Sequence, residues 1–157
     1  MSTPAQIAKH LREVYFGGNW TSVNLRDSLK EVTWQQAIKP IFGLNTIAIL
    51  LNHVHYYVRI VTKVLEGGPL VGKDKESFTH PPIASEQDWL AMQNQAWEEL
   101  EKFAKLIEKL PEERLWQEFS DPKYGVYYRN LHGIIEHVHY HLGQIVIIKK
   151  LHAQLGD

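Results

Sequence analysis

The amino-acid sequence predicts an all-α protein, most simply a four-helix bundle with one long loop between its second and third long helices. Three observations lead to this prediction. Four long segments carry apolar residues every three or four positions, as amphipathic helices do. No pair of segments shows the alternation of apolar and polar residues that is typical of paired strands, and no internal repeat divides the chain. With 157 residues and 44% hydrophobic residues, the chain is expected to form one helical domain over residues 1–157.

The first long helix is expected to begin at Thr3. A threonine N-cap there, with Pro4 in the first turn and Gln6 three residues after the cap, would form a capping box. The helix should end near Tyr15, because the glycine pair Gly17-Gly18 follows at once.

Two short helices and the second long one follow. The segment from Val23 to Leu29 is expected to be helical, and the capping pattern Thr33 to Gln36 should open another short helix that Pro40 ends. The second long helix is expected over Thr46 to Glu66. The segment Leu70 to Ala84 is rich in Gly, Pro, Ser and Lys and lacks a helical period, so it should be a long loop.

The last two long helices are separated by an irregular connection. Ser85 should cap a helix that runs to about Leu110 and ends at Pro111. After the irregular residues Pro111 to Tyr124, the fourth long helix is expected over Val126 to Ala153.

Composition argues against several classes of function. The formal net charge is -1 and lysines and arginines are scattered, so we expect no nucleic-acid partner. The most apolar run, Leu44 to Leu65, is interrupted by residues that would be costly in hydrocarbon, so no membrane span is expected: Asn52, His53, His55, Arg59 and Lys63. The absence of cysteine excludes disulfides and thiolate ligands, and it fits a cytoplasmic protein.

The segment Glu136 to Gln144 carries two histidines, His137 and His141, four residues apart in the last expected helix. At about 3.6 residues per turn, these two side chains lie on one face and can point at one ion. His139 lies about 160° away round the same helix and cannot join them. A metal site therefore needs at least one further ligand from elsewhere in the chain.

His53 is the candidate for that ligand. It lies within the apolar stripe of the second long helix, with Ile49 and Tyr57 within about 80° of it on a helical wheel. His141 lies within about 60° of the centre of the last helix's apolar stripe, and His137 lies at about 100°. We therefore expect three imidazoles to converge at the edge of one core. The alternative is that each is a hydrogen-bonded core histidine that binds no metal.

Such a triad suits divalent metal chemistry. Neutral imidazole binds Zn²⁺, Ni²⁺, Cu²⁺ or Fe²⁺, and three protein ligands leave one position open for water. A metal there would bring the pKa of that water down toward about 7, or would activate a thiol in the same way.

The same residues resemble the signature of the DinB/YfiT-like superfamily of metal-binding four-helix bundles. The segment His137 to Ile145 looks like the family's H-x-x-x-H-x-G-Q-I pattern. Leu50 to His53 looks like its second-helix histidine, and Gly17 to Thr21 is similar to a turn found in one branch. The likeness covers nearly the full length, and its specific part is the pattern on the last helix.

The resemblance implies that His53, His137 and His141 bind zinc or nickel, and that the protein is a homodimer. The resemblance does not settle the activity, because members of the family are described as metal-dependent hydrolases, as transferases or isomerases that use a low-molecular-weight thiol, or as proteins of no known reaction. We expect hydrolysis or thiol transfer on a small-molecule substrate. Catalytic residues beyond the triad remain unknown, because no further acid or base stands at a fixed spacing from it.

Several neighbouring residues have two interpretations. Gln144 lies on the same side as His141 and could orient one of the histidines, or it could be a solvated amide. Tyr57 and Tyr140 could donate hydrogen bonds to a substrate or could simply pack, and Glu136 is not expected to reach the ion. The histidines expected on the surface are His10, His80 and His152.

Two further functions compete with a metal-dependent enzyme. One is a non-catalytic metal-binding or stress-response module whose site is structural or vestigial. The other is a helical interaction protein without a metal. The second apolar side of the second long helix consists of Leu51, Val54, Val58 and Leu65. It fits either deep burial in the monomer or a dimer interface.

Overall fold

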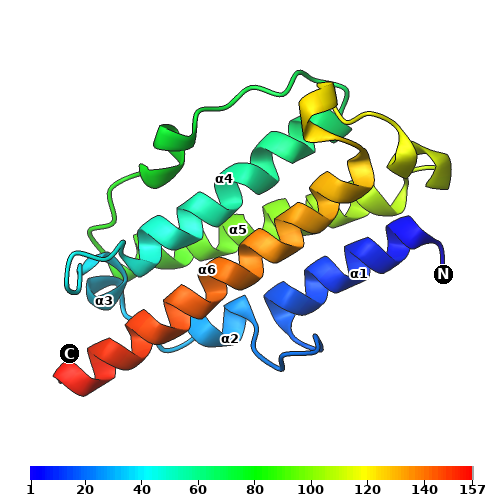
Figure 1. Ribbon diagram of the computed structural model, residues 1–157. Helices are drawn as coiled ribbons and strands as arrows, with labels where there is room; N and C mark the ends of the chain where they lie inside the picture. Colours follow the sequence, from blue (N-terminus) through cyan, green and yellow to red (C-terminus); the bar gives the residue numbers. More distant parts are fainter. Residues whose placement is uncertain (157) are drawn as a thin grey trace.

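The computed structural model describes residues 1–156, and in this range the chain is helical (Figure 1). The four long helices are α1 (Thr3–Phe16), α4 (Ile47–Leu65), α5 (Glu86–Glu108) and α6 (Tyr127–Leu155). The short elements are the helices α2 (Leu25–Leu29) and α3 (Trp34–Ile38) and the 3-10 turns η1 (Asp74–Phe78), η2 (Glu112–Trp116) and η3 (Pro122–Tyr124). Residues 1–156 form no strand, and only an isolated bridge joins Glu118 to Val126. The prediction of an all-α chain with four long helices is confirmed.

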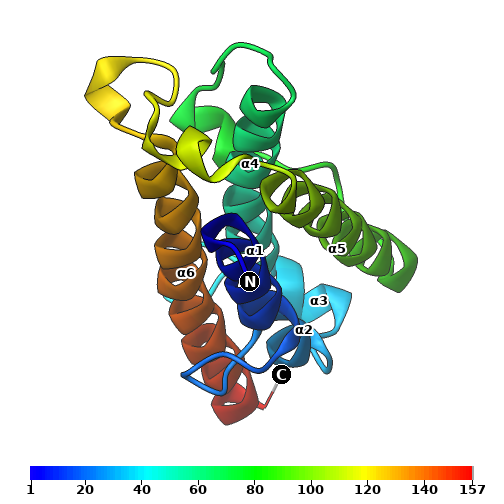
Figure 2. The same cartoon turned by 90° about the vertical axis from the view of Figure 1, so that its right-hand side faces the viewer.

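The four long helices pack as a bundle. α1 packs against both α5 and α6, and α4 packs against the same two helices, as the two views in Figures 1 and 2 show. None of the helices in residues 1–156 is both long enough and apolar enough to cross a membrane. The short helices α2 and α3 fill the end of the bundle where α6 terminates (Figure 1).

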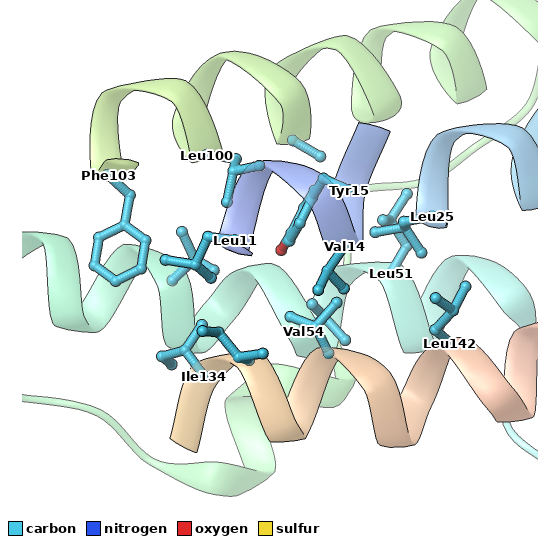
Figure 3. Close-up of a cluster of buried hydrophobic side chains, with 14 of the residues drawn as sticks. Leu11, Val14, Tyr15, Leu25, Leu51, Val54, Leu100, Phe103, Ile134 and Leu142 are labelled. Carbon is cyan, nitrogen blue, oxygen red and sulfur yellow. The ribbon is translucent and has the colours of Figure 1, made fainter. Parts of the chain in front are cut away.

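The interior is a continuous apolar cluster to which every long helix contributes (Figure 3). Burial of such side chains is the main favourable term in folding. The labelled side chains in Figure 3 are Leu11, Val14 and Tyr15 from α1, Leu25 from α2, Leu51 and Val54 from α4, Leu100 and Phe103 from α5, and Ile134 and Leu142 from α6. The second apolar side of α4 is largely buried within this chain, because Leu51, Val54 and Val58 are at most 1% exposed and Leu65 is half-buried.

The helix ends mostly follow the capping residues in the sequence. Thr33 and Gln36 form the reciprocal capping box at α3, and the Ser85 hydroxyl accepts a hydrogen bond from the Asp88 amide at α5. The N-cap of α1 was wrongly predicted: it is Ser2, whose hydroxyl accepts from the Ala5 amide. Thr3 is already helical, and its hydroxyl donates instead to Glu112 at 2.6 Å, a partner far away in sequence.

The connection between α4 and α5, residues 70–84, is a long loop as expected, but it is fastened to α4. Its one turn of helix is η1, and the Asn52 side chain donates to the carbonyls of Ser77 at 2.7 Å and Thr79 at 3.0 Å. A Cβ atom at Gly72 would lie 2.2 Å from Ile60 Cδ1, so glycine lets the loop approach α4. We refer to residues 70–84 as the strap.

His152 was expected on the surface, and this was wrong: its side chain is 1% exposed. Helix α6 runs on to Leu155, and α2 packs against α6 beside its C-terminal half (Figures 1 and 2). A bundle of four helices alone has no short helix in this position. The sequence pattern of α6 therefore did not indicate that α2 packs beside its last turns.

Candidate metal centre

The structure brings His53 of α4 together with His137 and His141 of α6. One nitrogen from each ring can be chosen so that all three lie within 4.8 Å of one another. Within residues 1–156 this is the one group of three or more His, Cys, Asp or Glu side chains close enough to hold a metal ion. His53 and His141 are buried and His137 is half-buried. The predicted convergence of the three imidazoles is therefore confirmed.

The spacing of the nitrogens fits a small divalent ion. His53 Nε2 and His137 Nε2 are 3.0 Å apart. Two imidazole nitrogens bound to one tetrahedral zinc, each at about 2.0–2.1 Å, are separated by about 3.3 Å. The two side chains thus already stand at nearly the distance that a shared ion requires.

Ser77 orients the ring of His53. The Ser77 hydroxyl donates to the Asp74 carbonyl at 2.5 Å, so its oxygen is free to accept from His53 Nδ1 at 2.6 Å. A proton on Nδ1 leaves the lone pair of neutral imidazole on Nε2, the atom that faces His137. This is the arrangement in which protein histidines bind metals.

Gln144 plays the same part for His141. Its side-chain carbonyl accepts from His141 Nδ1 at 2.7 Å, which again leaves the Nε2 lone pair available. Gln144 follows His141 by three residues on α6, so the helix itself places the acceptor beside the ring. Of its two interpretations, the orienting role agrees with the structure.

Aromatic rings surround the triad. Phe78 stacks on His53 with ring centroids 4.3 Å apart, and Tyr57 packs edge-on against His53 and His137 at 5.3 and 4.9 Å. Tyr140 packs edge-on against His141 at 4.9 Å. These contacts restrict the orientations of the imidazoles and limit the access of water.

Their surroundings favour the uncharged form of two of the imidazoles, those of His137 and His53. Burial, followed by the neighbouring rings of His141 and His53, lowers the pKa of His137 to about 4. Burial, and then the nearby His141, also lowers the pKa of His53, against a smaller opposing effect of Asp74. Neutral imidazole is the form that binds a metal, so His53 and His137 do not have to release protons at neutral pH.

A cavity of about 600 Å³ reaches His53 and His137. Such a volume suits a small-molecule ligand. Its wall combines aromatic and apolar side chains with three charged ones: Asp74, Arg129 and Glu136. Glu136 lines the cavity without belonging to the three-histidine group, as expected.

The strap contributes two functional candidates that sequence reasoning missed, Ser77 and Asp74. The Tyr57 hydroxyl donates a hydrogen bond to the Asp74 carboxylate inside the cavity. Burial, and then this bond to Asp74, raises the pKa of Tyr57 to about 12, so its hydroxyl keeps its proton at neutral pH. Both strap residues lie in an aperiodic segment, and nothing in the sequence indicates that it folds back onto α4.

The other histidines do not form a second centre in the described part of the chain. His10 and His139 have ring centroids 6.2 Å apart, and His132 packs against Tyr128. His55 lies on the other side of α4, 2% exposed and edge-on to Tyr15.

Comparison with known proteins adds no relative: no protein-family model, curated protein or solved structure matches the chain. The functional argument therefore rests on the site itself.

Proposed function

We propose that this chain is a DinB-like metal-dependent enzyme that acts on a small molecule, with zinc or nickel held by His53, His137 and His141. The observation that carries the proposal is the convergence of three imidazoles beside a cavity of about 600 Å³. Its support is twofold: two of the rings have fixed tautomers, and the nitrogens of His53 and His137 stand at nearly the spacing of metal ligands.

The ligand set favours a catalytic over a closed site. Structural zinc sites normally have four protein ligands, whereas catalytic sites have three and keep one position open. Residues 1–156 offer three. All three are imidazoles, which suit zinc or nickel and disfavour magnesium or calcium.

A bound ion would supply Lewis-acid activation of a water molecule or a thiol in the open position. Asp74 and Tyr57 supply the proton chemistry beside it. Tyr57 donates to one carboxylate oxygen, Asp74 Oδ1, and the other oxygen could accept a proton in the cavity. The Tyr57 hydroxyl fixes the direction of that carboxylate.

The cavity supports two reactions, hydrolysis of a small substrate and transfer of a low-molecular-weight thiol to an electrophile. Both need the same activated nucleophile and the same proton acceptor, so the reaction must be assigned by assay. For either reaction, we propose that the protein acts in the cytoplasm as a homodimer.

The test measures the turnover rate of the zinc- or nickel-loaded protein in two assays. Hydrolysis is assayed with p-nitrophenyl acetate, and thiol transfer is assayed with cysteine and monochlorobimane. At least one reaction should require the metal, and Asp74→Asn should lower its rate by about 10²-fold or more while the metal stays bound. The matched control is Asp121→Asn, a half-buried aspartate outside the cavity. Turnover that survives removal of the metal would overturn the proposal.

A structural metal is the second candidate, because the triad joins α4 to α6 and two of its rings are buried. An ion there would tie two long helices together and stabilise the fold. This alternative predicts a large drop in Tm on metal removal, with no metal-dependent turnover of either probe.

A further inference from the structure

The cavity at the triad extends along two helices, well beyond the histidines. Its wall includes His53 and Val61 of α4 and His137 and Arg129 of α6. The two residues of each pair are eight positions apart on one helix, which corresponds to about 12 Å along the helix axis. α4 and α6 pack side by side and run in opposite directions, so Val61 and Arg129 lie toward the same end (Figure 1). We call this end of the cavity, opposite the triad, the distal end.

The charged side chains of the cavity are divided between its two ends. Glu136 directly precedes His137, and Asp74 accepts a hydrogen bond from Tyr57, whose ring packs against His137. Both carboxylates therefore belong to the triad end. Among the described lining residues, Arg129 is the one lysine or arginine, and it lies at the distal end. The cavity is thus negative near the triad and positive away from it.

The guanidinium of Arg129 can bind a further anionic group. Its Nη1 donates to the Tyr124 carbonyl at 3.1 Å, which leaves its other N–H donors available. Arg129 forms no ion pair within residues 1–156, although two carboxylates line the same cavity. The side chain is exposed, so a ligand in the cavity can reach it. The fork of N–H donors on a guanidinium matches the two oxygens of a carboxylate.

The path between the two ends is apolar and open. Ile60 of α4 and Ile134 of α6 line the cavity between its ends. Gly133 also lines it, four residues from Arg129 and four from His137, and these spacings place all three on one face of α6. A Cβ atom at Gly133 would meet no other atom within 4 Å. The missing side chain leaves room for a ligand to lie along α6 from Arg129 to the triad.

We propose that the substrate of this site is an elongated molecule whose carboxylate binds Arg129 at the distal end. Its apolar middle packs over Gly133, against Ile60 and Ile134. Its reacting group lies at the triad, about 12 Å away along the helix axes. One guanidinium balances one negative charge, so a carboxylate suits this end better than a doubly charged phosphate. The position of the reacting group rests on the proposed function, whereas the carboxylate site rests on Arg129 and the cavity wall.

The test measures the affinity of three thiols for the zinc-loaded, full-length protein by isothermal titration calorimetry. The probes are 8-mercaptooctanoate, 8-mercaptooctanol and 3-mercaptopropionate, and each offers its thiol to the metal. The long acid should bind about ten-fold more tightly than the long alcohol, because its carboxylate reaches Arg129. The short acid does not reach the distal end, so its affinity should not depend on Arg129.

Two cation variants test the partner of the carboxylate. Arg129→Gln should reduce the preference for the long acid over the long alcohol to about one. Lys123→Gln is the matched control, because Lys123 is an exposed cation outside the cavity that pairs with Asp121 at 3.5 Å. This control should change the preference by less than about two-fold.

Two glycine variants test the path of the ligand along α6. Gly133→Leu fills the space between the two ends, so it should abolish binding of both long thiols and leave binding of 3-mercaptopropionate unchanged. Gly143→Leu is the matched control, because a Cβ atom at Gly143 also meets no other atom within 4 Å but this glycine does not line the cavity. It should change the affinity of none of the three probes.

A second titration separates this proposal from the proposed function. Octanoate and 1-octanol, which carry no thiol, are titrated into the metal-free protein labelled with ¹⁵N, and the amide signals of Gly133 and Asn130 are followed by NMR. Octanoate should bind more tightly than octanol to the wild type but not to Arg129→Gln. If no thiol binds through zinc while this difference persists, the proposed function fails and the carboxylate site stands.

The proposal is supported if the long acid is preferred in the wild type and in Lys123→Gln but not in Arg129→Gln. It is overturned if the wild type binds the long acid and the long alcohol equally, or if Arg129→Gln keeps the preference. It is also overturned if octanoate and octanol bind equally to the metal-free wild type.

Discussion

The side chains of His53 and Ser77 meet at 2.6 Å although 24 residues separate them in sequence. The serine hydroxyl is committed as a donor to the Asp74 carbonyl, so the imidazole must donate from Nδ1. This one contact fixes the tautomer of His53 and attaches the strap to the triad. It makes the strap part of the candidate metal site.

We expect Ser77→Ala to weaken zinc affinity by about 10- to 100-fold, the usual effect of losing a partner that orients a ligand. The measurement is competition with a chromophoric chelator at constant pH. Thr79→Ala is the control, because Thr79 engages Asn52 through its backbone carbonyl, which the substitution keeps. Equal affinity in wild type and Ser77→Ala would show that the hydroxyl does not orient the ligand.

Gln144 gives a paired test on the other helix. Gln144→Leu removes the acceptor for His141 Nδ1 and should also lower zinc affinity by about ten-fold or more. Gln144→Glu keeps an oxygen in the same place and should retain wild-type affinity or exceed it. If both variants bind zinc equally, the contact has no part in metal binding.

Acid should destabilise the metal-free protein because burial and the neighbouring rings lower the pKa of His137 from 6.5 to about 4. Between these two values the unfolded chain binds a proton that the folded chain does not, so the free energy of unfolding falls as pH falls. Urea denaturation of the metal-free protein at pH 7 and pH 5 measures this change. His137→Gln should lose less stability over this interval, and an identical loss in both proteins would contradict the assignment.

How far the sequence predicts this site depends on the periodicity of each element. His137, His141 and Gln144 lie on one regular helix, so their common face follows from spacing. His53 required one step more, the assumption that the apolar stripes of α4 and α6 face each other. That assumption holds, since α4 packs against α6.

Ser77 and Asp74 could not be predicted because the strap has no period. Its position depends on contacts with single side chains of α4, such as Asn52 and Tyr57, and on the close approach at Gly72. The wrong predictions for Thr3 and His152 have a similar origin. Thr3 contacts η2 and α6 contacts α2, and a local sequence pattern does not indicate such tertiary contacts.

The hydrogen bond from the Trp89 indole to the Val32 carbonyl, 2.8 Å long and buried, joins α5 to the connection between α2 and α3. Trp89→Phe removes this donor and leaves the carbonyl unpaired, so it should lower the free energy of unfolding by about 1–3 kcal/mol. Trp116→Phe, at a position 58% exposed, is the control and should change it by less than about 0.5 kcal/mol. Chemical denaturation measures both values, and equal effects would contradict this role for Trp89.

The most direct test of the central claim is the metal content of tag-free protein, measured by elemental mass spectrometry for wild type, His137→Ala and His139→Ala. His139 lies on the same helix outside the triad and serves as the matched control. We predict one equivalent of zinc or nickel in wild type and His139→Ala, and loss of the metal in His137→Ala. A wild type that carries no metal and takes up none when zinc or nickel is added would contradict the account and leave the three histidines as core packing.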